Sequence, residues 1–330
     1  MKPTPITTTI DYARQGVQHG HLKLPHSHDA SAWGVIPIPI TVIANGTGPT
    51  ALLTGANHGD EYEGPTALSK LAGSLTAGEV NGRVIIVPFM NYPAFLAGRR
   101  TSPIDAGNMN RIFPGKPDGG VTEKIADYFQ RVLLPMSEFV LDLHSGGKTL
   151  EFVPFAAAHV LPDAAQQARC VAAMQAFAAP YSMMLLELDA LSLYDTAAEE
   201  MGKVFVTTEL GGGGSTTPHT IEVAESGVHN FLVHAGIKQG ELIARDSVAL
   251  DMPDGDCYLA CEHEGLLEMH VTLGDRVQAG DLVARVHRTD RNGEAPSEYF
   301  TKRGGLVAGR HFPGLIKPGD FLSVVGVTAD

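Results

Sequence analysis

The sequence predicts an α/β protein, in which a mixed sheet flanked by helices is followed by a smaller C-terminal β domain. Between residues 51 and 236, short apolar segments alternate with longer amphipathic segments. This alternation is typical of strands and helices that follow one another in an α/β fold. After about residue 238, the helical patterns end and short strands recur between Gly-Asp, Pro-Gly and Asn-Gly turns. We therefore expect two domains, at residues 1–240 and 241–330.

The elements of the first domain follow from the length and spacing of their apolar residues. The strands are short and continuously apolar, and we expect them at residues 51–55, 83–89, 139–143, 183–188 and 204–208. The helices are rich in Ala or regularly apolar, and we expect them at residues 65–75, 122–134, 164–178 and 217–235. Such an order places helices on the faces of the sheet.

In the second domain, residues 264–283 resemble the hairpin of biotinyl and lipoyl domains. No lysine of this region lies in a matching attachment motif. We expect the shape of that hairpin without the prosthetic group. A carrier or binding module is the non-catalytic alternative, and covalent biotin or lipoate would reveal it by mass.

Charge and composition exclude several classes of function. The net charge is −13, so the phosphates of a nucleic acid would be repelled. No apolar segment approaches the roughly 20 residues that span a bilayer, and the first residues lack the apolar segment of a secretory signal. Three cysteines are too few for a disulfide framework and fit a reducing compartment. We expect a cytoplasmic protein with no nucleic-acid or membrane partner; the sequence leaves its oligomeric state open.

Candidate metal ligands follow two of the expected strands. His58 and Glu61 come directly after residues 51–55, three positions apart around a turn, and His144 follows residues 139–143. The carboxyl ends of strands in an open α/β sheet converge, so the three side chains can meet. Two histidines and one glutamate leave a fourth position for water, as in catalytic zinc sites. Asp142 could orient His144, or pack under the sheet edge.

A candidate general base follows the last strand of the first domain. Glu209 comes directly after residues 204–208 and before the glycines 211–214. A carboxylate beside a metal can accept the proton of the attacking water and return it to the leaving amine. The glycines would let backbone lie close to a ligand. No Gly-Lys-Ser/Thr follows them, which disfavours a phosphate-binding loop.

Substrate contacts are expected from residues 99–115. A guanidinium matches a carboxylate bidentately, so Arg111 is suited to a substrate carboxylate, with Asn110 donating beside it. Arg100 would suit a developing oxyanion, although Arg99 is adjacent and the sequence does not separate the two. Glu187 and Asp189 follow another strand and could meet an amino group of the substrate, or be loop carboxylates; we leave them outside the predicted site.

Four motifs in this order resemble the succinylglutamate desuccinylase and aspartoacylase family, relatives of the zinc carboxypeptidases. They are residues 58–61 (HGDE) with 63–64 (EG), 108–115 (NMNRIFPG), 142–145 (DLHS) and 208–209 (TE). The resemblance covers residues 50–236 and implies a zinc carboxypeptidase-like mixed sheet, with one zinc ion per chain. It implies metal binding by His58, Glu61 and His144, and a general base at Glu209. It also implies that Asn110 and Arg111 bind the substrate carboxylate and that Arg100 assists the oxyanion.

Within this family, residues 31–34, 38–40 and 57–65 are most similar to the Nα-acetyl-L-2,4-diaminobutyrate deacetylases of ectoine breakdown. The resemblance implies a small N-acyl amino acid as substrate, with acetate as one product. A succinylglutamate desuccinylase, an aspartoacylase-type deacylase and a metallocarboxypeptidase are the alternatives among enzymes.

Two other groups of ligand-type residues have simpler explanations. His19, His21, His26 and His28 precede the main fold in a segment punctuated by Pro and Gly, where a surface loop or strand end is expected. Such a segment lacks the rigid support that a catalytic site needs. A structural zinc site in the second domain, at residues 257–263, would lack a fourth ligand at the usual spacing, so burial explains its two cysteines better.

Overall fold

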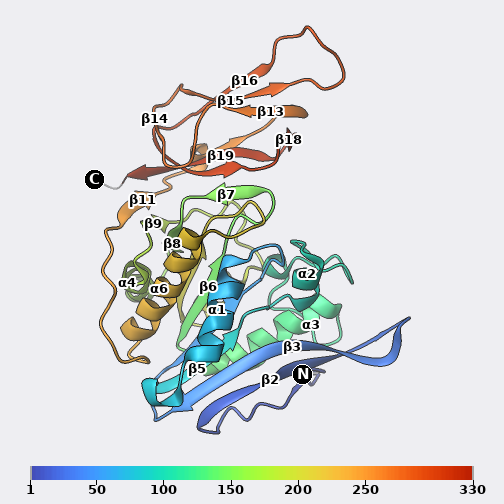
Figure 1. Cartoon of the computed structure of the whole chain (residues 1–330), viewed down its shortest axis with the longest axis vertical. Helices are drawn as coiled ribbons and strands as arrows, with labels where there is room; N and C mark the ends of the chain where they lie inside the picture. The colour runs from blue at the N-terminus through green and yellow to red at the C-terminus, as the bar shows by residue number, and fades with distance from the viewer. Residues whose placement is uncertain (1, 329–330) are drawn as a thin grey trace.

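The computed structural model describes residues 2–328, and its centre is a mixed sheet (Figure 1). Four neighbouring parallel strands form its middle, in the spatial order β5 (Gly82–Val87), β4 (Thr50–Gly55), β6 (Phe139–His144) and β10 (Val204–Glu209). Their residues are almost all buried, as expected for strands covered on both faces. The predicted α/β class is confirmed.

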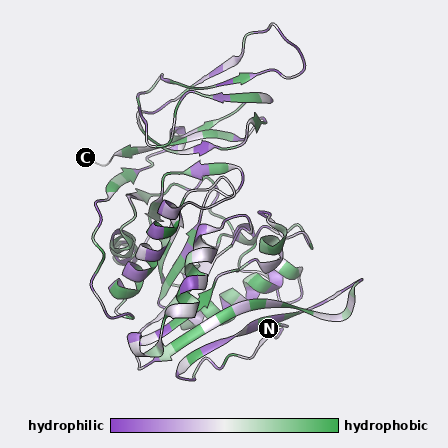
Figure 2. Cartoon of the chain, in the orientation of Figure 1, coloured by the Kyte–Doolittle hydropathy of each residue, from purple (hydrophilic) through white to green (hydrophobic). Residues whose placement is uncertain are grey.

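Helices cover both faces of these strands. One face packs against α1 (Glu63–Ser74), α4 (Ala164–Phe177) and α6 (Pro218–His234). The opposite face packs against α3 (Val121–Tyr128) and α5 (Tyr194–Glu200). Successive residues of each central strand pack alternately into the two hydrophobic cores, because side chains alternate across a sheet. Figure 2 shows the matching alternation of hydrophilic and hydrophobic residues along α1 and α6.

Two predicted elements differ from the structure for identifiable reasons. The helix expected at residues 122–134 is α-helical only to Tyr128 and continues as a π-helical turn, Phe129–Leu133, and a 3₁₀ turn, Leu134–Met136. Pro135 lies in that last turn and cannot donate a backbone hydrogen bond. The strand expected at residues 183–188 is β9, Tyr181–Met184. It ends early because its neighbours on both sides stop at the register of Met184.

A long hairpin, which the sequence did not predict, forms one edge of the sheet. Strands β2 (Gly16–His28) and β3 (Ser31–Asn45) pair with each other, and β3 pairs with β5 (Figure 1). The four N-terminal histidines therefore lie in β2, with His26 and His28 at its end, as the strand-end expectation had it; the alternative of a surface loop was wrong. The rings of His26 and His28 stack at 5.3 Å, and the two possible metal-binding groups of residues 2–328 lie elsewhere.

The C-terminal part continues the same sheet and adds a second one. Strand β11 (Val248–Asp251) pairs with β9 on one side and with β19 (Phe321–Thr328) on the other. The other strands of this part are β12 (Tyr258–Ala260), β13 (Gly265–Met269), β14 (Arg276–Val277), β15 (Leu282–His287), β16 (Ser297–Phe300), β17 (Gly305–His311) and β18 (Leu315–Ile316). Strands β13 and β15 pair antiparallel, as a hairpin across residues 264–283 requires.

The short elements lie at the carboxyl end of the central strands or at the edges. Strand β7 (Leu150–Phe152) pairs with β17, and β8 (Phe155–Ala158) pairs with β10 and β9. The remaining ones are β1 (Thr7–Thr8), α2 (Tyr92–Ala97) and the 3₁₀ turns Ala77–Glu79, Met109–Arg111 and Gly255–Cys257. No helix within residues 2–328 has both the length and the apolar character needed to cross a membrane.

Candidate active site

The turn after β4 places two buried side chains in contact. His58 and Glu61 are 3% and 2% exposed, and His58 Nδ1 lies 2.7 Å from Glu61 Oε1. Between them, Gly59 lies so close to α2 that an added Cβ would be 2.1 Å from the carbonyl carbon of Ala94. Only glycine fits this position without moving backbone, which explains the Gly of the HGDE motif.

His144 reaches the same carboxylate from the neighbouring strand. Gly55 of β4 pairs with Leu143 of β6, so the two strands end side by side. His144 Nδ1 lies 2.9 Å from Glu61 Oε2, and Glu61 therefore contacts both histidines. One ligand-type atom from each of the three residues lies within 4.8 Å of the others. The predicted convergence at the strand ends is present.

Both imidazoles are held through their outer nitrogens. His58 Nε2 lies 3.2 Å from Asn108 Oδ1, and His144 Nε2 lies 2.8 Å from Asp142 Oδ2. Asp142 in turn accepts hydrogen bonds from Thr54 Oγ1 and Asn57 Nδ2. These contacts direct both Nδ1 atoms toward Glu61, as carboxylates and amides that contact the other ring nitrogen do for metal-binding histidines.

The orienting groups were only partly predicted. Asp142 orients His144, as the sequence allowed, because residues two apart on a strand share a face. The sequence did not predict the orienting contacts of Asn108, Asn57 and Thr54. Asn108 lies within one of the motifs, and Asn57 lies directly before another. Nothing in their spacing indicates which buried atom they contact.

The charges of the group favour a cation. Burial disfavours the ionised form of Glu61, but the two imidazoles outweigh burial and lower its pKa. Burial also lowers the pKa of His58 to about 4, which leaves a neutral imidazole. At His144, burial is outweighed by Asp142 and Glu61, which raise its pKa well above the usual value. Positive charge is therefore stabilised beside Glu61, and a zinc ion could replace that proton; two imidazoles and a carboxylate are suitable ligands.

Glu209 lies beside this group at the end of β10. It is the register partner of His144, and its Oε2 is buried with no hydrogen-bond partner within residues 2–328. Burial and the charge of Glu61 raise the pKa of Glu209 to about 8. The glycines that follow contact the protein's own backbone: a Cβ at Gly212 would lie 2.2 Å from the carbonyl oxygen of Leu150. The close approach at Gly212 is therefore to Leu150, the first residue of β7, and not to a ligand.

All seven predicted site residues line one cavity of about 160 Å³: His58, Glu61, Arg100, Asn110, Arg111, His144 and Glu209. Arg100 Nη1 lies 3.7 Å from Glu61 Oε1, whereas Arg99 is absent from the lining. Asn110 is anchored because its Oδ1 accepts from the amide of Tyr194. Arg111 donates through Nη1 to the carbonyl oxygen of Asn110. The roles of these residues in catalysis remain predictions.

Two further carboxylates complete the lining, and the sequence identified only one of them as a candidate. Glu187 and Asp195 lie on the cavity wall, whereas Asp189 is exposed and does not line this cavity. Asp195 lies in the first turn of α5, a seven-residue helix that the apolar pattern did not predict. No motif links it to the other residues.

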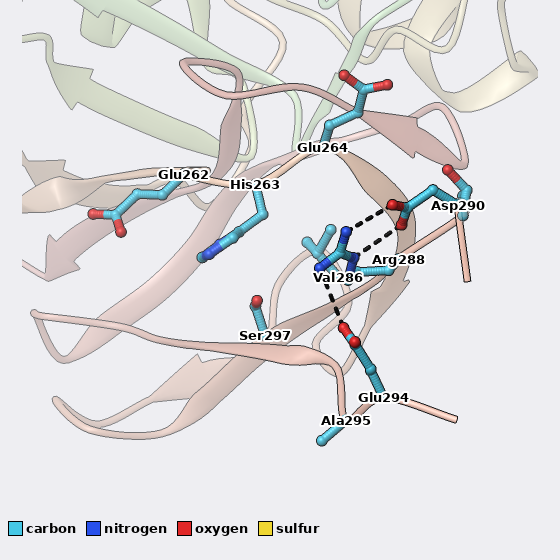
Figure 3. A pocket seen from close by; sticks show the side chains of 10 residues that line it. Glu262, His263, Glu264, Val286, Arg288, Asp290, Glu294, Ala295 and Ser297 are labelled. Atoms are coloured by element: carbon cyan, nitrogen blue, oxygen red, sulfur yellow. Dashed lines mark hydrogen bonds and ion pairs between the residues drawn. The ribbon is translucent and has the colours of Figure 1, made fainter. Parts of the chain in front are cut away.

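A larger cavity, of about 640 Å³, lies in the C-terminal part and shares no residue with the first (Figure 3). Its one arginine, Arg288, pairs with Asp290 and Glu294 (Figure 3). Nearby, Cys261 Sγ contacts the carbonyl oxygen of His263, whose ring contacts Tyr299. Neither of the two possible metal-binding groups in residues 2–328 includes these side chains.

Comparison with known proteins agrees with this geometry. Residues 47–235 match the succinylglutamate desuccinylase/aspartoacylase catalytic domain. The N-alpha-acetyl-L-2,4-diaminobutyric acid deacetylase of Halomonas elongata is 59% identical over 326 residues, which are 98% of this chain and 95% of that protein. The product-bound ectoine utilization protein EutE (DoeB) from Ruegeria pomeroyi is 63% identical, with a TM-score of 0.98 over 99% of this chain and 100% of that one.

A more distant structure supports the same assignment. The succinylglutamate desuccinylase/aspartoacylase from Rhodobacter sphaeroides is 35% identical, with a TM-score of 0.94 over 99% of this chain and 100% of that one. The resemblance read from the four motifs is thereby confirmed, and so is the expectation of an enzyme of the amidohydrolase class. The chain belongs to the succinylglutamate desuccinylase/aspartoacylase family.

Proposed function

We propose that this enzyme hydrolyses the amide bond of Nα-acetyl-L-2,4-diaminobutyrate and releases acetate and 2,4-diaminobutyrate, a step of ectoine degradation. The observation that carries the proposal is the similarity to the Halomonas elongata deacetylase, which extends over nearly the whole of both chains. The cavity supports it, because it gathers a possible metal site, a carboxylate base and two arginines around a space suited to a small molecule.

We propose that one zinc ion per chain is held by His58, Glu61 and His144. Bound zinc acidifies a water molecule and polarises the acyl carbonyl. The donor set, its burial and the orienting contacts of both outer nitrogens support this assignment.

Glu209 is the general base of this proposal. Its unpartnered Oε2 accepts a proton from the attacking water, and the same proton then passes to the nitrogen of the leaving amine. The C–N bond breaks as the new C–O bond is retained, and the second proton of the water passes from the resulting acid to the amine, so the products are a carboxylate and an ammonium. A bound cation beside Glu209 would favour the ionised form that accepts the first proton, and burial, which raises the pKa of Glu209, makes the protonated form a competent acid in the second step.

Two arginines are assigned to the negative charges of the reaction, one to the developing oxyanion and one to the substrate carboxylate. Arg100 lies within 3.7 Å of Glu61 and can stabilise negative charge that develops on the carbonyl oxygen. Asn110 and Arg111 bind the α-carboxylate of the substrate, since both line the cavity and the guanidinium offers a bidentate contact. The metal ligands, Arg100 and Glu209 therefore surround the scissile amide, and Arg111 holds the far end.

The cellular location of the enzyme, its partners and its division into domains are also proposals. We propose a cytoplasmic enzyme, without nucleic-acid partners in view of its net charge of −13. We also propose the domain division at residues 1–240 and 241–330. Residues 239–247 contain no helix or strand, although β11 beyond them joins the sheet of the first part.

The proposal is tested by metal analysis of the purified protein together with a hydrolysis screen. The substrates are Nα-acetyl-2,4-diaminobutyrate, N-acetylaspartate, N-succinylglutamate and a short peptide. We expect one zinc per chain and hydrolysis of the first compound alone. Preference for either acidic compound would establish another deacylase of the family, and peptide cleavage would establish a carboxypeptidase. An intact mass raised by biotin or lipoate would support a carrier instead.

A further inference from the structure

A second group of ligand-type side chains lies on the wall of the active-site cavity. His159 follows β8, Glu187 follows β9, and Asp195 lies in the first turn of α5. One ring nitrogen of His159 and one oxygen from each of the two carboxylates lie within 4.8 Å of one another. Glu187 and Asp195 line the same cavity as the proposed metal ligands and Arg111, so this group faces the substrate.

The two carboxylates have no counter-charge in contact. Within residues 2–328, the ion pairs closer than 4.0 Å include neither Glu187 nor Asp195. His159 is already paired, because its Nδ1 lies 2.9 Å from Glu199 Oε1. Its other nitrogen, Nε2, is buried without a hydrogen-bond partner in the described part of the chain. Asp195 Oδ1 accepts hydrogen bonds from the amide and the hydroxyl of Thr196, so what the two carboxylates lack within the described residues is an ionic partner closer than 4.0 Å.

The pKa shifts of Glu187 and Asp195 indicate the charge of a ligand that would suit them. Burial, together with Asp195, raises the pKa of Glu187 to about 7, and burial also raises the pKa of Asp195. The cationic groups that oppose these shifts are His159 for both carboxylates and Arg111 for Glu187. A further cation placed between the two carboxylates would offset the cost of burying their charges and the repulsion of Glu187 by Asp195.

We infer that Glu187 and Asp195 bind the side-chain ammonium of the substrate and thereby select a cationic over an anionic acyl amino acid. The inference rests on the proposed function, whose substrate carries an α-carboxylate and a γ-ammonium. Arg111 and this carboxylate pair offer the two opposite charges within one cavity. An ammonium group has three donors for two acidic acceptors. The second carboxylate of N-acetylaspartate or N-succinylglutamate would be repelled at the same place.

His159 is a positioning residue in this arrangement. It is 8% exposed, its ring contacts Glu199 of α5, and it does not line the cavity that the two carboxylates line. A divalent metal is the alternative occupant, because an imidazole and two carboxylates are also metal ligands. The ammonium is favoured because the group borders the substrate cavity and the substrate itself brings the cation.

The test compares two substrates of the same shape that differ in charge. Nα-Acetylnorvaline replaces the ammonium of Nα-acetyl-2,4-diaminobutyrate by a methyl group and retains the α-carboxylate and the acetyl group. We expect the zinc-loaded wild type to prefer the charged substrate by about 100-fold or more in kcat/KM, mostly through KM. In Glu187→Gln and Asp195→Asn, this ratio should fall to within a few-fold of one. Glu200→Gln, which removes an exposed charge from the same helix, should keep the wild-type ratio.

Binding of the products provides the second readout. By calorimetry, 2,4-diaminobutyrate should bind the wild type about 100-fold more tightly than norvaline, and Glu187→Gln should abolish that difference. Equal losses on both substrates, or a second zinc per chain that Glu187→Gln removes, would overturn the ammonium site. If the wild type hydrolyses neither compound, the proposed function fails, and the binding comparison still decides whether the carboxylates recognise an ammonium. Partly exposed Glu187 serves as the main variant, should buried Asp195 be needed for folding.

Discussion

The two histidine–carboxylate groups of the cavity differ in how completely their contacts are made. In the first, both histidines contact Glu61 through Nδ1 and an orienting residue through Nε2. In the second, Glu187 and Asp195 have no ionic partner within residues 2–328, and one nitrogen of His159 has no partner. This difference fits the two proposals, a resident ion at the first group and a transient cationic ligand at the second. Geometry that is fully determined suits a cofactor, whereas residual charge suits recognition.

Removing a ligand from the first group should have the largest effect. In His144→Ala, metal content should fall from one zinc per chain to nearly none, and hydrolysis should fall to background, because the two remaining ligands cannot complete the site. Inductively coupled plasma mass spectrometry and the rate of acetate release measure both. His159→Ala is the matched variant in the second group and should retain the metal. Loss of zinc from His159→Ala would show that the two groups are not distinct.

The base should contribute less than the metal site but leave that site intact. In Glu209→Gln, kcat should fall by about 10²–10⁴-fold, because the amide cannot take the proton of the attacking water. Zinc content should stay at one per chain, since Glu209 lies beside the three ligands and is not one of them. A variant that turns over at the wild-type rate would refute the assigned role.

The charge on His159 in the second group should make the free energy of unfolding depend on pH. Burial tends to lower the pKa of His159, but Glu199 and the nearby carboxylates raise it to about 9. Because the pKa of His159 is higher in the folded than in the unfolded protein, protonation of this residue stabilises the fold. The stabilisation is complete below pH 6.5 and is lost as the pH rises through 9. The shift corresponds to about 3 kcal/mol at most. Urea unfolding between pH 7 and 9.5 should show this loss in the wild type.

The control for this prediction changes the histidine. His159→Gln should lose less stability over that range than the wild type does, because only the contribution of His159 is removed and Glu209, whose pKa is raised to about 8, still titrates there. His219→Gln changes an exposed histidine at the start of α6 and should follow the wild type. Glu187 does not confuse the result, because its pKa is raised only to about 7. The loss of stability that follows from its raised pKa develops between pH 4.5 and 7 and is nearly constant above pH 7. A wild type whose stability is constant from pH 7 to 9.5 would contradict the proposed His159–Glu199 pairing.

The orienting carboxylate of the first group should have the smallest effect. In Asp142→Asn, the affinity for zinc should fall by about 10–100-fold, because the amide supports the imidazole of His144 less well. Competition with a chelator measures it. Glu138→Gln, at the residue directly before β6, should bind zinc as the wild type does. An unchanged affinity in Asp142→Asn would show that the negative charge of Asp142 is not needed to hold His144 for the metal.

The sequence predicted the central sheet well because buried parallel strands are continuously apolar, and its errors have physical causes. The strand expected to Leu188 stops at Met184 because its neighbours end there, which no local pattern indicates. The long N-terminal hairpin was missed because its prolines and glycines suggested a loop, although pairing with β5 holds it in the sheet.

By itself, the sequence indicated a metal site at His58, Glu61 and His144 with a base at Glu209, since each of these residues follows a predicted apolar strand and parallel strands end at one edge of a sheet. Only the tertiary structure decided that Arg100 rather than Arg99 lines the cavity, that Asn108 holds His58, and that Asp195 joins Glu187. These contacts depend on how loops and a short helix pack across the strand ends. Their partners are therefore distant in sequence and share no period with them.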